Sequence, residues 1–378
     1  MKKTIFAVFV LVLSLARVCS PDARELISKK PLYGGALTEQ ARSVTALADI
    51  RTADLYGDKR EFIVDYSSNS FKLVRFSIGE SSGQLKVEGE ITTANRTRLL
   101  KEYRIFCWGA ADTDNNGKDE ILLFYNGILK KYEWDGAKFG ETEIEFPEVI
   151  DSFITGDINN DKINEIAAFS YFKGDIEKSQ EFKANFCIWN VSGGKAEKLW
   201  EDNKQLEYKN NSFIPPDRLN CISDIDNDGI TELIADRGQM GATPTVYDFY
   251  VWKSTGLVFA GAKVFSKNKI YGSNEFVKKN LSAENKVPYL IGPFTVIREN
   301  RRNKIVAWCM DSAAGRPKAV AVSAGKTGFK IEKTLFSNPG DMPPPAVSWI
   351  NFDGKGRGIL VISPGDRKRT KITWSFYR

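Results

Sequence analysis

The stretch Cys221-Ile-Ser-Asp-Ile-Asp-Asn-Asp-Gly-Ile-Thr-Glu-Leu-Ile-Ala-Asp236 places oxygen-bearing side chains at a fixed spacing. With Asp224 as position 1, carboxylates fall at positions 1, 3, 5 and 9, on Asp224, Asp226, Asp228 and Glu232. A hard divalent ion such as Ca²⁺ takes about six to eight oxygen ligands, and a loop curled around it can add a backbone carbonyl. The carbonyl of Ile230, at position 7, suits that role. The stretch therefore predicts a calcium-binding loop.

The same spacing occurs twice more, nearer the N-terminus. The second set of expected ligands, with the position 7 carbonyl last, is Asp112, Asp114, Asn116, Glu120 and Lys118. The third set, in the same order, is Asp157, Asn159, Asp161, Glu165 and Ile163. Position 6 is glycine in two loops but Lys162 in the third, where a side chain must adopt a conformation that glycine takes more cheaply. Three copies in one chain indicate a repeated structural unit.

Two other structures have loops of similar composition. An EF-hand needs a Glu at position 12 and a following helix, but position 12 is Leu123, Ala168 or Ala235, each within a strand-like run. A tight turn rich in Asp and Asn, without an ion, has a similar composition. However, three or four carboxylates that converge on one point repel one another without a cation. We therefore expect Ca²⁺ in all three loops.

The N-terminus has the pattern of a secretory signal peptide. Lys2 and Lys3 precede an apolar run over residues 5–16, which is too short to span a bilayer of about 30 Å. Cleavage after Ala16 or Ser20 fits this pattern, and Cys19 raises a lipoprotein alternative that Arg17 disfavours. We expect residues 1–20 to be removed and the protein to be exported to the periplasm, the cell surface or the medium.

Composition excludes several functional classes. The chain has no histidine, so Ser-His-Asp and Cys-His catalysis and histidine-bound zinc are excluded. Loss of residues 1–20 with their three basic side chains lowers the formal net charge from +6 to +3, which gives no reason to expect a nucleic-acid partner. Four cysteines remain in apolar runs, and buried thiols are favoured over disulfides; they are Cys107, Cys187, Cys221 and Cys309.

Strand patterns repeat in units of four. The clearest unit has predicted strands at 105–109, 121–125, 129–134 and 139–146, with the loop between the first two strands and an Asp-Gly hairpin turn before the last. Six such units can be traced over residues 46–378, the first strand being predicted at 46–50. The last unit lacks one strand, and the leader of residues 21–45 would close a ring by supplying it. The fold class predicted is an all-β β-propeller of four-stranded blades.

The segments 223–235 and 111–123, with Lys131-Tyr-Glu-Trp-Asp-Gly-Ala-Lys-Phe139 after the second, resemble FG-GAP or VCBS repeats. These repeats build the propellers of integrin α-subunits and of many secreted bacterial proteins. The resemblance covers residues 46–378 and implies calcium between the first and second strands of a blade, with a binding or adhesion role. This chain departs from the pattern in its first, fifth and sixth loops, which lack most acids. Integrins usually have seven blades, whereas six can be traced here.

We therefore expect a monomeric binding module for a protein or glycan partner. Polar inserts at 173–182 and 266–286 are candidate ligand sites, and basic residues around Arg301 and at 367–371 are either solvated hairpin tips or an anion site. The alternative is a carbohydrate-active enzyme, either a polysaccharide lyase or a glycosidase. A glycosidase needs paired carboxylates, but the clustered carboxylates already belong to the cation loops.

Overall fold

The structure is a computed structural model. It describes residues 33–36, 50–67, 70–78, 83–93, 106–125, 127–172, 184–202, 218–236, 246–254, 256–264, 270–271, 289–299, 302–310, 317–325, 328–337, 346–350, 357–364 and 372–377. The predicted signal peptide, the insert at 173–182, Arg301 and the basic segment 367–371 lie outside these residues. No helix in the described ranges has the length and apolar character needed to cross a membrane.

The described strands form six antiparallel sheets, of which the first three each contain four strands in sequence order. Sheet 1 contains β2 (Ile50–Ala53), β3 (Phe62–Ser67), β4 (Ser70–Ile78) and β5 (Gly83–Thr92). Sheet 2 contains β6 (Phe106–Ala111), β7 (Glu120–Tyr125), β8 (Ile128–Trp134) and β9 (Phe139–Glu145). Sheet 3 contains β10 (Glu148–Gly156), β11 (Glu165–Phe172), β12 (Ala184–Asn190) and β13 (Glu197–Asp202).

The remaining sheets lie in the C-terminal half and include one with an extra strand. Sheet 4 contains β14 (Arg218–Ser223), β15 (Glu232–Asp236), β16 (Val246–Lys253), β17 (Gly256–Val264) and β18 (Ile270–Tyr271). Sheet 5 contains β19 (Tyr289–Glu299), β20 (Arg302–Met310), β21 (Pro317–Gly325) and β22 (Gly328–Ser337). Sheet 6 contains β1 (Tyr33–Ala36), β25 (Ile372–Tyr377), β24 (Gly358–Pro364) and β23 (Ala346–Ile350), in that order.

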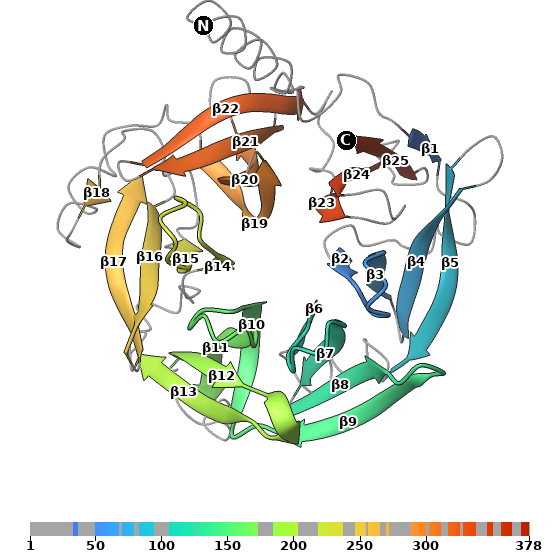
Figure 1. Cartoon of the computed structure of the whole chain (residues 1–378), viewed down its shortest axis with the longest axis horizontal. Coiled ribbons are helices and arrows are strands. Elements are labelled where there is room, and N and C mark those ends of the chain that lie inside the picture. The colour runs from blue at the N-terminus through green and yellow to red at the C-terminus, as the bar shows by residue number, and fades with distance from the viewer. Residues whose placement is uncertain are drawn as a thin grey trace, which may run out of the picture.

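The sheets are arranged as blades around a central axis (Figure 1). The first strand of each unit is innermost, and each of these strands contacts the innermost strand of both neighbouring sheets, in the cyclic order β2, β6, β10, β14, β19, β23. The chain is thus an all-β β-propeller with four-stranded antiparallel blades, as the repeat pattern predicts. In sheet 6, β1 pairs with β25 over Tyr33↔Phe376 to Ala36↔Thr373, so a strand of the N-terminal leader completes the last unit.

The hydrophobic core lies between neighbouring sheets. Each described cluster takes its buried side chains from two adjacent blades. For example, Phe146, directly after β9, packs against both Phe124 of sheet 2 and Trp189 of sheet 3. Trp189 and Tyr132 are buried in these clusters. Cys107, Cys187 and Cys221 are free thiols, whereas the Cys309 side chain is outside the described set.

Two predictions are refined by the structure. Strand β2 spans Ile50–Ala53, and its pairing with β3 continues until Ala53 opposes Phe62, directly before the loop that begins at Asp54. Of the strand predicted at 46–50, residues 46–49 lie outside the described residues. The segment 266–286 is not only a polar insert, because it contains β18, which pairs with β17 through Lys263↔Ile270. The other predicted strand positions agree with the observed ones to within a few residues.

Candidate metal centre

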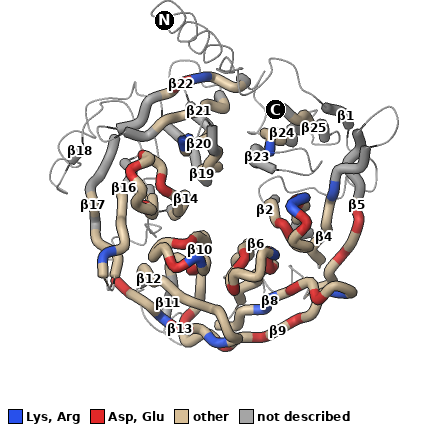
Figure 2. The backbone as a smooth tube through the Cα atoms, in the orientation of Figure 1, with Lys and Arg blue, Asp and Glu red and all other residues tan. Residues whose placement is uncertain are grey.

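The predicted cation loops join the first and second strands of sheets 2, 3 and 4, and a related loop occupies the same place in sheet 1. We call them loop 1 (54–62), loop 2 (112–120), loop 3 (157–165) and loop 4 (224–232). In each, eight residues separate the last paired residue of the first strand from the first paired residue of the second, as between Ser223 and Glu232. Their acidic residues gather around the middle of the ring (Figure 2).

The four loops share one backbone conformation. Positions 4 and 6 have positive φ in every loop, and the residues involved are Gly57, Lys59, Asn115, Gly117, Asn160, Lys162, Asn227 and Gly229. Glycine and asparagine tolerate this region best, which explains most of these residues. Lys162 adopts it with φ of 74°, as its place in the repeat requires, and Lys59 does so in loop 1. Loop 1 is therefore the same turn although it lacks the full set of acids.

The position 1 carboxylate holds each turn together. Asp112 accepts hydrogen bonds from the backbone N–H groups of Asn116 (3.1 Å) and Gly117 (2.9 Å). Asp224 accepts them from Asp228 and Gly229, both at 3.1 Å. Asp157 is bonded in the same way in loop 3. These bonds fix the loop around the carboxylate.

The position 9 glutamate is buried beneath each acidic loop. One oxygen accepts the backbone N–H of position 2, at 2.9 Å for Glu120, 3.0 Å for Glu165 and 2.9 Å for Glu232. Burial raises the pKa of each of these carboxyls to about 7. The second oxygen of Glu120 is buried and has no hydrogen-bond partner in the described structure. A bound cation would satisfy that oxygen and stabilise the charged carboxylate.

Loop 4 provides the most complete donor set. One carboxylate oxygen from each of Asp224, Asp226, Asp228 and Glu232 lies within 4.8 Å of the others. Within the described part of the chain, Asp224, Asp228 and Glu232 accept hydrogen bonds from backbone N–H groups and form no ion pair. Four hard oxygen donors this close together fit Ca²⁺. The carbonyl of Ile230 belongs to the same loop.

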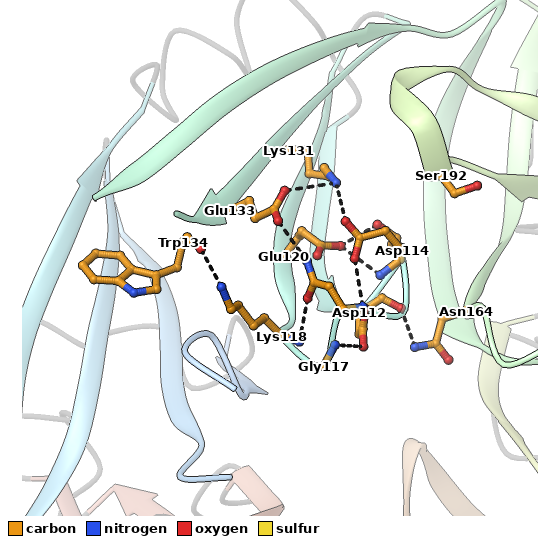
Figure 3. Close-up of polar contacts among 12 residues, drawn as sticks. Asp112, Asp114, Gly117, Lys118, Glu120, Lys131, Glu133, Trp134, Asn164 and Ser192 are labelled. Carbon is orange, nitrogen blue, oxygen red and sulfur yellow. Dashed lines mark hydrogen bonds and ion pairs between the residues drawn. The ribbon is translucent and has the colours of Figure 1, made fainter. Parts of the chain in front are cut away.

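Loop 2 brings Asp112, Asp114 and Glu120 within the same distance of one another (Figure 3). Its surroundings differ from those of loop 4, because the Lys131 ammonium lies 3.6 Å from Asp114 Oδ2 and 3.5 Å from a Glu133 oxygen. Asn116 is also engaged: Oδ1 accepts the N–H of Lys118 and Nδ2 donates to Glu133 at 2.9 Å. The negative charge of loop 2 is therefore partly balanced by Lys131, a side chain of β8. The spacing of acids in the sequence does not reveal this contact.

In loop 3, a side-chain amide lies between two of the acids. Asn159 Nδ2 donates to Asp161 at 3.0 Å and to Glu165 at 2.9 Å, while Oδ1 accepts the N–H of Asp161. Asp161 also accepts the N–H of Ile163 at 2.8 Å. A nitrogen thus lies where an oxygen ligand is expected, and Asn159 must turn its amide before it can ligate a cation. Asp157 does not join these residues in a cluster as tight as those of loops 2 and 4.

At loop 1, an arginine from the neighbouring strand β4 lies against the turn, where the other loops have acids. Position 9 is Phe62, and the guanidinium of Arg75 lies 3.8 Å from its ring centroid and 5.1 Å from that of Tyr56. Arg75 Nη2 reaches Asp58, at position 5, over 3.5 Å and the carbonyl of Arg60 over 3.2 Å. Arg75 is almost fully buried. The repeat spacing did not single out this residue, because it lies on β4, outside the loop.

The fifth unit has no room for such a loop. The last paired residues of β19 and β20 are Glu299 and Arg302, so two residues, 300 and 301, separate them, compared with eight in loops 1–4. Lys304 forms an ion pair with Glu332, so it is not a free contributor to an anion site. Arg302 is exposed.

No family model matches the chain, and no curated protein matches it. Several solved structures are similar in fold at low identity. A lectin of Agrocybe aegerita described as recognising non-reducing terminal N-acetylglucosamine aligns with 14% identity and a TM-score of 0.44, over 86% of this chain and 79% of that one. The rhamnogalacturonan lyase YesW aligns with 13% identity and a TM-score of 0.36, over 82% and 64%. The Dos1 propeller aligns with 11% identity and a TM-score of 0.36, over 86% and 68%.

Proposed function

We propose that this protein is a calcium-stabilised β-propeller of the FG-GAP or VCBS type that acts outside the cytoplasm as a binding module. The observation that carries the proposal is the convergence of four carboxylates in loop 4. Such a cluster is costly in a folded protein unless a cation neutralises it. Loop 2 is the second proposed site, and loop 3 is a third that requires the Asn159 amide to turn.

A structural role for the ion fits its surroundings. In loop 4, Ile225 at position 2 is buried in the core between sheets 4 and 5, and Glu232 at position 9 starts β15. An ion bound by the acids of this loop would link the loop to β15 through Glu232. It would also fix Ile225 in its packing against the neighbouring blade. Binding to the native state alone adds about 2.7 kcal/mol to stability at a hundredfold excess over Kd.

Binding is favoured over catalysis because the clustered carboxylates of the described residues already have structural partners. Within these residues, the loop acids bond backbone amides or neighbouring side chains. We propose a protein or glycan as the partner, and export directed by residues 1–20. Outside the loops, Glu148 and Glu201 form a further cluster with Cys187, and Lys198 pairs with both carboxylates. The enzymatic alternative therefore requires another constellation of acids.

Two measurements test the proposal. After calcium has been removed with a chelator, calorimetric titration of the protein with CaCl₂ should show saturable binding. The melting temperature of the protein should rise when calcium is added. A glycan array and a protein pull-down, each run with and without calcium, should then identify the partner class. Absence of saturable calcium binding would refute the calcium part of the proposal, and turnover of a glycan on the array would replace the binding module with an enzyme.

A further inference from the structure

One loop position without a predicted role makes contacts between neighbouring blades. The residue at position 8, directly before the last loop position, points away from its own loop and toward the preceding one. In loop 3 this residue is Asn164, whose Nδ2 donates to the backbone carbonyl of Asp112 at 2.7 Å (Figure 3). Asp112 is position 1 of loop 2. The contact crosses 52 residues of sequence.

The same relationship recurs around the ring. In sheet 5 the equivalent residue is Asn303, whose Nδ2 donates to the carbonyl of Asp224 at 2.5 Å, while its backbone N–H donates to Asn227 Oδ1 at 2.5 Å. In loop 2 it is Asp119, which bonds Asp54 twice: its N–H donates to the Asp54 carbonyl at 3.0 Å, and its Oδ2 accepts the Asp54 N–H at 2.6 Å.

Two further blade boundaries use this position with different chemistry. Thr231 of loop 4 donates to Asn160 Oδ1 of loop 3 at 3.2 Å. Arg357, before the first residue of β24, forms an ion pair with Glu61, which is position 8 of loop 1. Five of the blade boundaries are therefore bridged through the same loop position, by side chains of five different types. Recurrence despite this variety indicates that the geometry, and not one residue type, is the repeated feature.

We infer that Asn303 and Asn164 are positioning residues for the cation sites of the preceding blades, Asn303 for loop 4 and Asn164 for loop 2. This inference rests on the proposed function. Each amide holds the carbonyl of the position 1 aspartate, the residue whose carboxylate is bonded by two backbone N–H groups of the loop. Fixing that residue at its main chain presets the direction of its carboxylate, so less ordering is needed when an ion binds.

The substitution Asn303→Asp separates positioning from charge. It keeps the shape of the side chain, removes the N–H donor and adds a negative charge near loop 4. Charge alone would strengthen binding of a cation, whereas loss of positioning weakens it. A carboxylate is compatible with this loop position, since Asp119 occupies it in loop 2. Asn164→Asp provides an independent test at loop 2.

The matched control is Asn115→Asp, which adds the same charge inside loop 2. Asn115 is exposed at position 4 and forms no bond to another loop within the described structure. It already has positive φ, which Asp also tolerates. This variant should bind calcium at loop 2 as tightly as the parent chain or more tightly.

Calcium affinity is measured by calorimetric titration of the full chain after its calcium has been removed with a chelator. To study loop 4, the Asp114→Ala substitution weakens the site at loop 2; to study loop 2, Asp226→Ala weakens the site at loop 4. We expect Asn303→Asp and Asn164→Asp to weaken the affinity of their respective sites about three- to tenfold, the equivalent of one hydrogen bond. A purely structural role instead predicts an equal fall in melting temperature with and without calcium, and an unchanged affinity.

The outcomes distinguish calcium binding itself from the positioning role of Asn303 and Asn164. If the parent chain shows no saturable calcium binding, the calcium part of the proposed function is wrong and this inference falls with it. If the parent chain binds calcium and both variants bind it equally well or better, only the positioning role is overturned. If one variant does not fold, the other decides the question at its own loop.

Discussion

The guanidinium of Arg75 lies 3.8 Å from the ring centroid of Phe62, the residue that occupies position 9 of loop 1 where loops 2, 3 and 4 have a glutamate. The Phe62 ring thus replaces the buried acid, and the positively charged side chain of Arg75 lies against the turn. Arg75 also reaches Asp58, so the remaining carboxylate has a positive partner. Loop 1 therefore keeps the turn without needing an ion.

The substitution Arg75→Met should destabilise the protein by about 2–3 kcal/mol, because it removes the cation–π contact with Phe62 and takes from Asp58 its buried positive partner. Urea denaturation measures this change. Arg60→Met is the matched control: Arg60 bonds the same carboxylate at 2.6 Å, but its side chain is 49% exposed. An exposed pair contributes about 0–1 kcal/mol. Equal losses in the two variants would show that Arg75 has no special role in loop 1.

Removal of one acid from loop 4 should reduce the calcium response. Asp226→Ala leaves three carboxylates in the cluster, so the gain in melting temperature on adding calcium to chelated protein should shrink. The full gain corresponds to about 2.7 kcal/mol at a hundredfold excess of calcium over Kd. Differential scanning fluorimetry with and without chelator measures it.

The control for that experiment is Asp135→Ala. Asp135 caps the hairpin turn between β8 and β9 by accepting the N–H groups of Ala137 and Lys138, both at 2.8 Å. Its loss should lower the melting temperature by a similar amount in the presence and absence of calcium. A calcium response that survives intact in Asp226→Ala would remove loop 4 from the set of cation sites.

The periodic spacing of acids, together with the strand patterns that follow each loop, was enough to predict the propeller and its four-stranded blades. Each loop is local in sequence, so positions 1 to 9 can be recognised without knowing the fold. The strands after each loop are short apolar runs that end at turn residues, such as 121–125 before the hairpin at Gly127. Such signals depend on neighbours a few residues away, which is why the strand positions were predicted closely.

The environment of each loop could not be predicted in the same way. Arg75 reaches Asp58 across 17 residues, and Asn303 reaches Asp224 across 79. These contacts depend on strand register and on the packing of separate blades. The orientation of the Asn159 amide also depends on hydrogen bonds that composition does not reveal. Sequence spacing therefore identified the candidate ligands, but not the side chains from other elements that contact them.

The pairing of β1 with β25 leads to a prediction about the N-terminal leader. Deletion of residues 21–45 removes β1 and exposes the edge of β25, which should cost about 2–4 kcal/mol of stability. An exposed strand edge should also cause association that increases with protein concentration. Thermal denaturation and light scattering measure the two effects. The control deletion, residues 21–30, leaves β1 in place and should have little effect on either measurement.

The contact between Gly109 of β6 and Phe153 of β10 tests how tightly neighbouring blades pack at the centre. A methyl group added at Gly109 would lie 2.8 Å from the tip of the Phe153 ring. We expect Gly109→Ala to cost about 1–3 kcal/mol, as overpacking in a core does. Urea denaturation measures the loss, and the control is Gly140→Ala, whose nearest neighbour would be 3.9 Å away and which should change stability by less than about 0.5 kcal/mol.

A second substitution distinguishes this clash from an effect on the backbone. Phe153→Leu shortens the side chain that the new methyl group meets, so Gly109→Ala should cost less in that background than in the parent chain. Phe153→Leu has its own cost, because it removes a ring contact with Phe124 at 4.9 Å. The sum of the two single losses should therefore exceed the loss in the double variant. Strict additivity would mean that Gly109 is needed for its backbone and not for the close approach of β10.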